Sequence, residues 1–469
     1  MKAARRFLLL ILSFVMIFCF VSQTGCSENN RKNADIIQFW HTYTGKQCNF
    51  FEMLVDTYNA TEGKRRNVYI EAQYKTESEI QRNLEKILDS KVSGSEYPEI
   101  TVVSSEMAYK AKMHNLVTKA EDYISKEELS KYFAGFMQEG QITGTGETYV
   151  FPISKTSSIT VINDSLWRQF YNSENINISQ WKTWNGITSL AEKYYAWTEG
   201  KALMAFESVE EYIFAFSAQM MPPLIQTGNK EIKINTNKEM LRAMWDFYYG
   251  GVVNGYILQT DNIVDSLEKG DIAAYVGTPH DPTYYPQRYT NHKGENDTFL
   301  ITSSTYPTVS ETRKTYVHKG NGVCVFDHGE RINQESYDFL HWFSTNENVI
   351  QFSIANNEIS SYKPIYDKSS TESYLKQISI INSNKHYMFS NSLSQVAEGT
   401  TYAPTGFVGY DSFCDEITQS LVQSSARGLQ KVLELEAGGK TRKQAVSEVF
   451  TNEEFELWYN AVLEITNKY

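Results

Sequence analysis

The chain has 469 residues, of which 44 are lysine or arginine and 56 are aspartate or glutamate, giving a formal net charge of −12. A protein this acidic does not neutralise phosphates, which argues against nucleic acid as a partner, and charge does not hold it on an anionic lipid surface. The length suffices for one large or two ordinary domains.

The first 26 residues are typical of an export signal. A basic start precedes an apolar run over residues 7–21, which is shorter than the roughly 20 residues that span a bilayer. The small pair before Cys26 resembles a bacterial lipobox, in which the cysteine is lipidated and becomes the mature N-terminus. We predict a signal peptide over residues 1–25. An ordinary secretion signal and a retained anchor are the alternatives, because Gln23 stands where an aliphatic residue is usual.

The mature chain is expected to begin with a short polar tether over residues 26–35. Residues 1–25 hold three basic and no acidic groups, so the remainder carries 41 basic against 56 acidic side chains, a charge of −15. Beyond Cys26, the cysteines at 48, 324 and 414 are far apart, and no pair has metal-ligand spacing. With Cys26 lipidated, at most one disulfide is possible, and we expect buried free thiols.

The first hundred residues alternate between strand and helix patterns. Apolar runs predict strands over residues 35–40, 68–72 and 98–103. Apolar side chains at helical spacing predict a helix around 50–58, and the sequence Thr76–Glu79 opens another helix as a capping box. This alternation is typical of a parallel sheet covered by helices, so we predict a doubly wound α/β protein.

The same two kinds of element continue to the C-terminus, and a protein of this length is more plausibly two lobes than one sheet. We predict helices opened by capping boxes at Ser125–Glu128, Thr236–Glu239, Thr441–Gln444 and Thr451–Glu454, and strands over 149–153, 159–162, 272–276, 298–302 and 322–326.

Six segments in a fixed order carry a resemblance to a known family. They are residues 37–41 (IQFWH), 97–100 (YPEI), 148–152 (TYVFP), 269–275 (KGDIAAY), 320–323 (GNGV) and 361–365 (SYKPI). Together, and behind a lipobox, they resemble the family 1 extracellular solute-binding proteins of ABC importers, in particular the group that binds glycerol 3-phosphate and maltose.

The resemblance implies a periplasmic-binding-protein-like fold of type II. Each lobe has a parallel-rich sheet flanked by helices and is discontinuous in sequence. We expect lobe 1 to comprise residues 36–151 and 308–375, and lobe 2 to comprise residues 152–307 and 376–469. The ligand would bind between the lobes, where strand C-termini and helix N-termini converge, and hinge closure would enclose it.

Candidate ligand contacts follow the predicted strands. Trp40, His41 and Tyr43 follow the first strand, and such aromatic rings stack on sugar faces in this family; core packing is the alternative. Ser105 and Glu106 follow the third strand, where relatives place a carboxylate that accepts hydrogen bonds from ligand hydroxyls. Glu106 is equally explained as a solvated acid favoured by the helix dipole.

Further candidates come from polar loops, each with a structural turn or hinge as the alternative. Gly277 and Thr278 end a strand before a proline, with Thr278 as a possible N-cap. Asn321 and Gly322 allow close backbone approach. The remaining candidates are Lys155, Thr156, Ser157, Ser158, Glu207, Tyr362 and Tyr402.

Two departures from the glycerol-phosphate group bear on the ligand. The late loop over residues 399–409 holds no basic residue, and acids at Glu207 and Glu210 stand roughly where that group has tryptophans. Both departures argue against a phosphorylated ligand and favour a neutral sugar or oligosaccharide.

The sequence therefore predicts a monomeric, lipid-anchored binding protein on the extracytoplasmic face of the membrane. It would capture a carbohydrate and deliver it to the permease of an ABC transporter, without a cofactor, metal or nucleic acid. The alternatives are a binder of glycerol phosphate or another non-sugar solute, a binding fold used for adhesion or signalling, and a carbohydrate-active enzyme with paired carboxylates.

Overall fold

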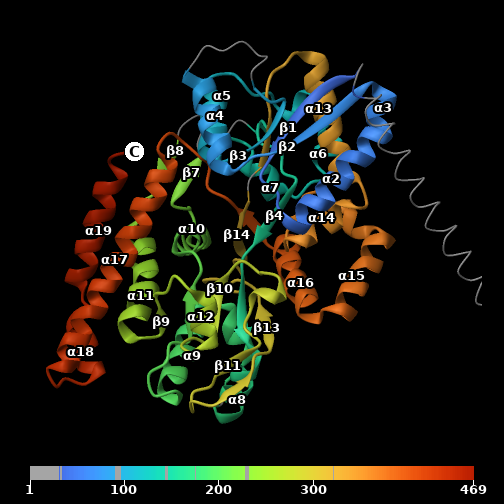
Figure 1. Cartoon of the computed structure of the whole chain (residues 1–469). Coiled ribbons are helices and arrows are strands. Elements are labelled where there is room, and N and C mark those ends of the chain that lie inside the picture. Colours follow the sequence, from blue (N-terminus) through green and yellow to red (C-terminus); the bar gives the residue numbers. More distant parts are fainter. Residues whose placement is uncertain are drawn as a thin grey trace, which may run out of the picture.

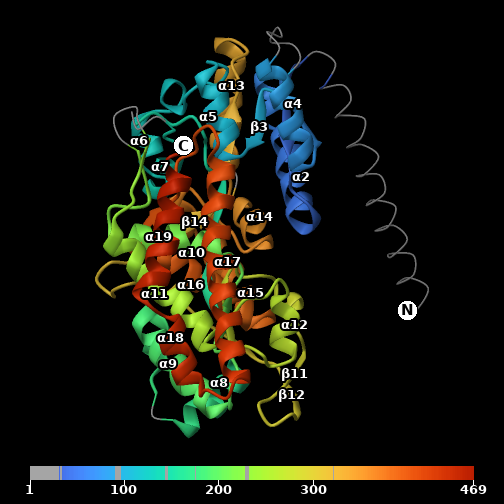
Figure 2. The same cartoon turned by 90° about the vertical axis from the view of Figure 1, so that its left-hand side faces the viewer.

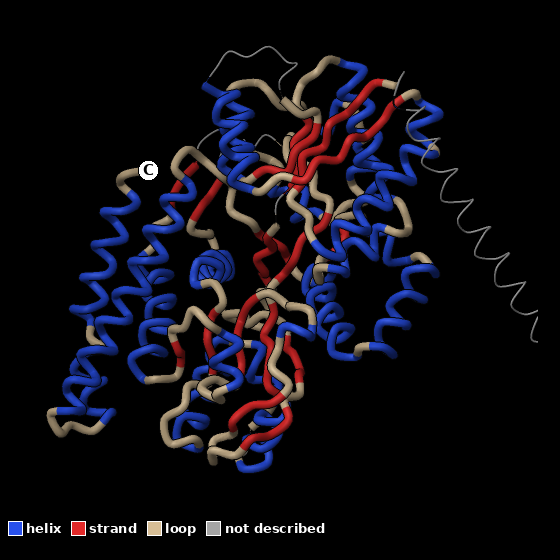
Figure 3. Tube along the Cα trace, viewed as in Figure 1, coloured by secondary structure: helices blue, strands red, loops and turns tan. Residues whose placement is uncertain are grey.

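Two separate β-sheets organise the chain into an upper and a lower lobe, joined by a smaller sheet (Figures 1 and 3). The computed structural model describes residues 31, 34–89, 97–142, 146–174, 176–227, 232–320 and 322–469. The predicted signal peptide, Cys26 and Asn321 lie outside the described residues.

Lobe 1 is built on a four-stranded sheet in the order β15-β3-β1-β2. β1 pairs in parallel with β2 and β3, while β15 is antiparallel to β3. Ile37 and Phe39 of β1 are fully buried against α2 and α13, as the apolar run predicted. The strands are β1 (Asp35–His41), β2 (Val68–Tyr74), β3 (Ile100–Val103) and β15 (Gly322–Val325).

Helices cover both faces of the lobe 1 sheet (Figure 1). The α-helices are α2 (Gly45–Ala60), α3 (Glu62–Arg66), α4 (Glu77–Asp89), α5 (Ser105–Met113), α6 (Lys126–Leu129), α7 (Ala134–Glu139), α13 (Glu330–Thr345) and α14 (Val349–Ala355), with short 3₁₀ helices η1 (Ala120–Asp122) and η4 (Lys363–Asp367).

Lobe 2 has a five-stranded sheet in the order β13-β5-β10-β6-β9. It is mixed rather than parallel-rich: β6 is parallel to β10 and β9, but β5 is antiparallel to both of its neighbours. The strands are β5 (Ile159–Asn163), β6 (Met204–Phe206), β9 (Ile257–Leu258), β10 (Ala274–Gly277) and β13 (Ile301–Ser304), with hairpins β7 (Ile225–Thr227)–β8 (Ile232–Ile234) and β11 (Arg288–Thr290)–β12 (Asn296–Thr298).

The helices of lobe 2 include a long C-terminal group. Figure 2 shows α17 running along the length of this lobe beside α19, with its N-terminal end at the height of lobe 1. The helices are α8 (Asp164–Ser173), η2 (Ile178–Lys182), α9 (Trp184–Trp197), α10 (Val209–Met220), α11 (Lys238–Asn254), α12 (Ile263–Glu268), η3 (Pro282–Tyr284), α17 (Tyr410–Ala437), α18 (Arg442–Val449) and α19 (Asn452–Thr466).

A third sheet, in the order β16-β4-β14-β17, lies between the lobes and carries the chain from one to the other (Figure 1). β4 and β14 are antiparallel and pair Ser157 with His318. We refer to β4 and β14 as the crossing strands. The elements of this region are β4 (Ser154–Ser157), β14 (Thr315–Lys319), β16 (Ile359–Ser360), β17 (Thr400–Tyr402), α15 (Ser369–Ile381) and α16 (Ser383–Glu398).

We propose that residues 36–151 and 308–375 form lobe 1, and that residues 152–307 and 376–469 form lobe 2.

Most of the predicted elements are confirmed, and three are displaced for local reasons. The helix α11 is capped by Asn237, whose side chain accepts from the amide of Met240, and not by Thr236. Residues 149–153 form a single bridge through Phe151 instead of a strand, because Pro152 cannot donate to a ladder. The strand predicted over 298–302 is divided between β12 and β13.

Within the described ranges, no helix is both long enough and apolar enough to cross a bilayer. Cys48, Cys324 and Cys414 are free thiols, of which Cys324 and Cys414 are buried as expected and Cys48 is half-buried. Burial raises the pKa of the Cys324 thiol.

Candidate functional site

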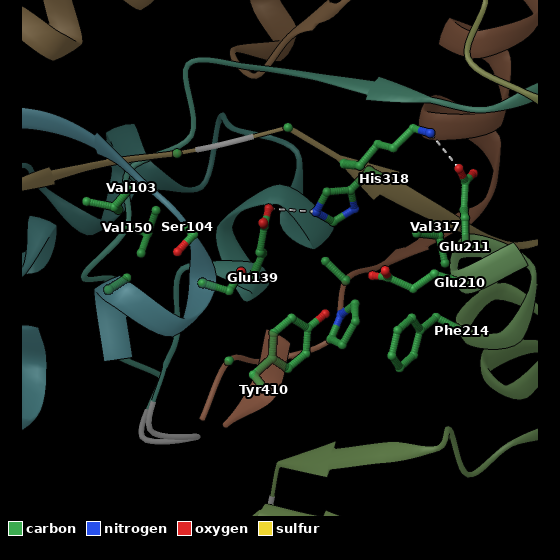
Figure 4. Close-up of a pocket in the computed structure, with 18 of the residues that line it drawn as sticks. Val103, Ser104, Glu139, Val150, Glu210, Glu211, Phe214, Val317, His318 and Tyr410 are labelled. Atoms are coloured by element: carbon green, nitrogen blue, oxygen red, sulfur yellow. Dashed lines mark hydrogen bonds and ion pairs between the residues drawn. The ribbon is translucent and has the colours of Figure 1, made fainter. Parts of the chain in front are cut away.

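A cavity of about 280 Å³ lies between the two lobes. Lobe 1 contributes the end of β3, the start of α5 and the end of α7, and lobe 2 contributes the start of α10 and the start of α17. The end of crossing strand β14 completes the wall (Figure 4). The lining residues that carry the argument are Ser104, Glu139, Glu210, Glu211, His318 and Lys319, together with the rings of Phe214 and Tyr410.

Two serine caps aim helix N-termini at this cavity. The Ser104 side chain follows β3 and accepts a hydrogen bond from the Met107 amide of α5 at 3.3 Å. Ser208 follows β6 in the same way and accepts from the Glu211 amide of α10 at 3.1 Å. Serine is a favoured N-cap residue, so each strand turns directly into a helix at the lobe interface. A ligand-binding crevice is expected at this edge of an α/β sheet.

Glu139 of α7 joins lobe 1 to both crossing strands. Its carboxylate lies 2.6 Å from Lys155 Nζ of β4 and 3.0 Å from His318 Nε2 of β14. Burial opposes the ionised form of Glu139, but the charge of Lys155 and the hydrogen bond from His318 outweigh it and lower its pKa to about 2. Glu139 is therefore ionised at neutral pH.

Glu211 of α10 makes the corresponding connection from lobe 2. Its Oε2 atom accepts from Lys319 Nζ at 2.7 Å and from Ser158 Oγ at 2.8 Å. Burial opposes the charge on Lys319, but Glu211 is the strongest of the neighbouring acids that raise its pKa. Each lobe thus presents one paired carboxylate to the cavity.

Glu210 differs from these two acids. It lines the cavity half-buried and makes no hydrogen bond or ion pair within the part of the chain that the structure describes. Burial raises its pKa, the nearby carboxylates of Asp415 and Asp411 raise it further, and the charge of Lys319 lowers it in part. Figure 4 shows its carboxylate extending into the space between Tyr410, His318 and Phe214.

Two smaller cavities share lining residues with the central one. A space of about 240 Å³ shares Val103 and Ser104 and reaches Thr42 and Glu77. A space of about 180 Å³ shares Glu139 and reaches Gln138 and Thr405.

Two of the predicted site residues line the central cavity, namely Ser105 and Gly322. Three others lie directly behind its wall: Lys155 and Ser158 bind the lining acids, and Ser157 donates to Val317. The Thr156 hydroxyl is buried without a partner among the described residues.

Glu106 bridges the lobes instead of pointing to open solvent. Its carboxylate lies 2.7 Å from Lys110 Nζ and accepts the Asp411 amide of α17 at 3.0 Å. A carboxylate at a helix N-terminus is favourable, and here the helix belongs to the other lobe.

The aromatic candidates, of which Trp40 and His41 end β1 and Tyr43 follows it, pack in the core of lobe 1 and line none of these three cavities. Trp40 is 8% exposed, with Lys75 Nζ 4.5 Å from its ring centroid. His41 stacks on Tyr43 with ring centroids 5.4 Å apart, and both pack against Phe51. Burial lowers the pKa of His41 to about 4.

The other candidates lie at the edge of the site or away from it. Glu207 accepts a hydrogen bond from the Thr278 amide at 2.6 Å and contacts His280. The next helix, η3, is capped by Asp281, so Thr278 is not an N-cap. Gly277 packs on Glu207, and Tyr362 packs on Tyr132. Tyr402 lines the 180 Å³ space and donates a hydrogen bond to the Ile225 carbonyl at 2.9 Å.

Sequence reasoning missed Glu139, Glu211, His318, Lys319, Phe214 and Tyr410 as lining residues. Glu211 had a usable signal, because it is the N3 residue of the Ser208 cap after β6. Glu139 and His318 come from segments 179 positions apart, and no local pattern marks them.

A family model described as a bacterial extracellular solute-binding protein matches residues 53–376. A search against functionally characterised proteins gives no significant match.

Many solved structures share the fold at low sequence identity. The cyclic alpha-maltosyl-1,6-maltose binding protein of Arthrobacter globiformis has a TM-score of 0.68 at 15% identity, covering 93% of this chain and all of that one. The sugar-binding protein MalE of Xanthomonas citri has a TM-score of 0.64 at 13% identity, covering 92% and 98%. UgpB of Mycobacterium tuberculosis, solved with glycerophosphocholine, has a TM-score of 0.62 at 13% identity, covering 91% and 99%. These likenesses confirm the predicted two-lobe fold.

Proposed function

This chain belongs to the bacterial extracellular solute-binding proteins, and from that premise we propose that it captures a carbohydrate between its two lobes and delivers it to the permease of an ABC transporter. The ligand is a sugar or an oligosaccharide without phosphate. The protein binds this ligand without chemical turnover.

The observation that carries the proposal is the central cavity between the lobes. This cavity presents carboxylates, a neutral imidazole and two aromatic rings, which together suit the hydroxyls and the apolar face of a sugar. The two smaller cavities that share lining residues with it would give room for more than one sugar unit. The fold shared with the cyclic alpha-maltosyl-1,6-maltose binding protein of Arthrobacter globiformis and with the sugar-binding protein MalE of Xanthomonas citri supports the same class.

A phosphorylated solute fits this lining poorly. Among the described lining residues there is no arginine, and the one lysine, Lys319, is already paired with Glu211. The N-termini of α5 and α10, which would attract an anion, carry acids in their first turns.

We further propose that the protein is a monomer on the extracytoplasmic face of the membrane, held by lipid on Cys26. The motif before Cys26 supports this, and residues 26–35 would let the lobes reach the permease. Intact-mass measurement of protein from a membrane fraction should show loss of residues 1–25 and added acyl mass. An unmodified Cys26 would remove the anchor and leave the binding function standing.

The ligand proposal is tested with purified residues 27–469 and an array of sugars, oligosaccharides and sugar phosphates. A ligand that binds the native state raises the melting temperature by mass action. We expect shifts with unphosphorylated saccharides and an unchanged saccharide after long incubation. Shifts with phosphorylated compounds alone would refute the ligand class, and consumption of the saccharide would refute the binding role.

A further inference from the structure

The charges around the central cavity do not balance. Glu139 is paired with Lys155, and Glu211 is paired with Lys319. Glu210 lines the same cavity and has no such partner among the residues described. A carboxylate that is partly removed from water beside other acids, with the charge of Lys319 shared among them, is costly. A cationic group in the cavity would therefore be stabilised there.

Two buried acceptors of the lining are also unfilled. Glu211 Oε1 and His318 Nδ1 are buried and accept no hydrogen bond from the described residues, and their residues are 7% and 1% exposed. His318 Nε2 faces the Glu139 carboxylate and carries the proton, which leaves Nδ1 as an acceptor (Figure 4). Burial lowers the pKa of His318, so its ring is neutral at neutral pH. Buried polar groups are normally hydrogen-bonded, so two unfilled acceptors in the wall leave negative partial charge uncompensated, which also favours a cation in the cavity.

Two aromatic rings, those of Phe214 and Tyr410, lie near the Glu210 carboxylate and on the same side of it in Figure 4. Phe214 is four residues after Glu210 on α10 and therefore on the same face of the helix. The Tyr410 ring lies almost parallel to that of Phe214, with centroids 6.4 Å apart and 18° between the planes. Aromatic faces attract cations, so a carboxylate with two rings nearby is a suitable environment for an ammonium group.

Resting on the carbohydrate function proposed above, we propose that the natural ligand is an amino-substituted carbohydrate whose protonated amine pairs with Glu210 beside Phe214 and Tyr410. A metal ion is a poorer occupant, because the described residues contain no group of three or more side chains arranged to hold one.

The test uses saccharides that differ in one substituent. Cellotriose, the glucosamine trimer and the N-acetylglucosamine trimer share a β-1,4 backbone and carry a hydroxyl, an ammonium or an acetamide group at C2. They are supplemented by an array of other neutral sugars and their amino counterparts. Binding to residues 27–469 is followed by thermal shift and by calorimetry.

We expect the amino saccharides to bind more tightly than their matched neutral forms. Glu210→Gln should weaken binding of the amino form by about 10- to 100-fold, the size of a lost charge-assisted contact. It should change the affinity for a neutral form by much less. Glu192→Gln, on the exposed face of α9, is the matched control and should leave every affinity unchanged.

The outcomes separate this inference from the proposed function. Equal binding of neutral and amino forms, or an amino form that is indifferent to Glu210→Gln, overturns the inference and leaves carbohydrate capture standing. Binding of spermidine in place of every saccharide, lost in Glu210→Gln, overturns carbohydrate capture and keeps the cation site. A complete lack of binding across the array and spermidine overturns both.

Discussion

His318 and Lys319 are neighbours on crossing strand β14, and their side chains bind acids of opposite lobes. His318 Nε2 lies 3.0 Å from Glu139 of lobe 1, and Lys319 Nζ lies 2.7 Å from Glu211 of lobe 2. Successive side chains of a strand point to opposite faces, so one strand can hold both lobes at adjacent positions.

Crossing strand β4 and the residue that follows it repeat this arrangement. Lys155 binds Glu139, and Ser158 binds Glu211. Because both acids line the cavity, the groups that fix the crossing strands are also groups that a ligand in this cavity would meet. A ligand can therefore influence lobe closure through the carboxylates it contacts.

Replacing Glu139 should destabilise the whole fold. Glu139→Gln leaves the Lys155 ammonium, which is 1% exposed, without its ion-pair partner, although the buried Glu358 carboxyl still interacts with it electrostatically. Removing one member of a buried ion pair costs about 3 kcal/mol, and we expect a loss of that order in the free energy of unfolding. Urea denaturation measures it, with the exposed Glu192→Gln as the control. A loss below about 1 kcal/mol would mean that water or a rearranged side chain stabilises the Lys155 ammonium in place of Glu139.

His41 should make stability depend on pH between about 4 and 6.5. Burial lowers its folded-state pKa from 6.5 to about 4, so on acidification the unfolded chain takes up this proton first. The stability contributed by the neutral ring is present above pH 6.5 and is lost as the pH falls to about 4. The full shift corresponds to about 3 kcal/mol.

Comparison with His41→Asn isolates that contribution. The variant should be less stable at pH 7 but should show a smaller slope of unfolding free energy against pH between 6.5 and 4. Equal slopes for the two proteins would assign the acid sensitivity to other groups. Glu139 and Glu207, whose pKa values are each lowered to about 2, would act in the same direction but at lower pH.

Glu106 should favour the closed arrangement of the lobes. Its carboxylate accepts the Asp411 amide, at the start of a helix whose N-cap, Gly409, has no side chain. Glu106→Ala removes this contact, which is worth about 1 kcal/mol as a helix cap, and should increase the open population about fivefold. Small-angle X-ray scattering or an interlobe spin-label distance measures the change.

Lys110→Met is the control for that variant. It removes the ion pair of Glu106 within α5 and leaves the contact with Asp411 in place. It should therefore keep the closed arrangement. An unchanged interlobe distance in Glu106→Ala would show that other contacts hold the lobes together.

The fold of lobe 1 could be predicted from the sequence because its signals are local. The apolar run of β1, the helical spacing in α2 and the capping box of α4 each lie within a few residues. In that capping box the Thr76 amide donates to Glu79 at 2.8 Å and the Glu79 amide donates to Thr76 at 3.3 Å. The direction of β5 was not predictable, because it depends on which strands of lobe 2 become its neighbours.

The candidate site was predicted less completely, for a related reason. Lys155 and Ser158 were selected as donors near the hinge, and they do bind carboxylates, but these are Glu139 and Glu211 of the protein itself. The aromatic residues Trp40 and His41 were selected for stacking and are buried in the core instead. A cavity between lobes is formed by segments that meet only in the folded chain, so no spacing in the sequence reveals which side chains share it.

Gly406 allows the lobes to approach, and its replacement should separate them. A Cβ atom at Gly406 would lie 2.3 Å from the Ser105 carbonyl oxygen, which is backbone of the other lobe and cannot turn away. Gly406→Ala should therefore open the lobes and weaken ligand binding, while each lobe keeps its own core.

Gly428→Ala is the contrast, because its Cβ would lie 2.4 Å from the Tyr249 hydroxyl within lobe 2. We expect Gly428→Ala to lower the free energy of unfolding by about 1–3 kcal/mol without changing the interlobe distance. Scattering and denaturation on both variants separate the two effects, and a closed, tightly binding Gly406→Ala protein would contradict the role given to this contact.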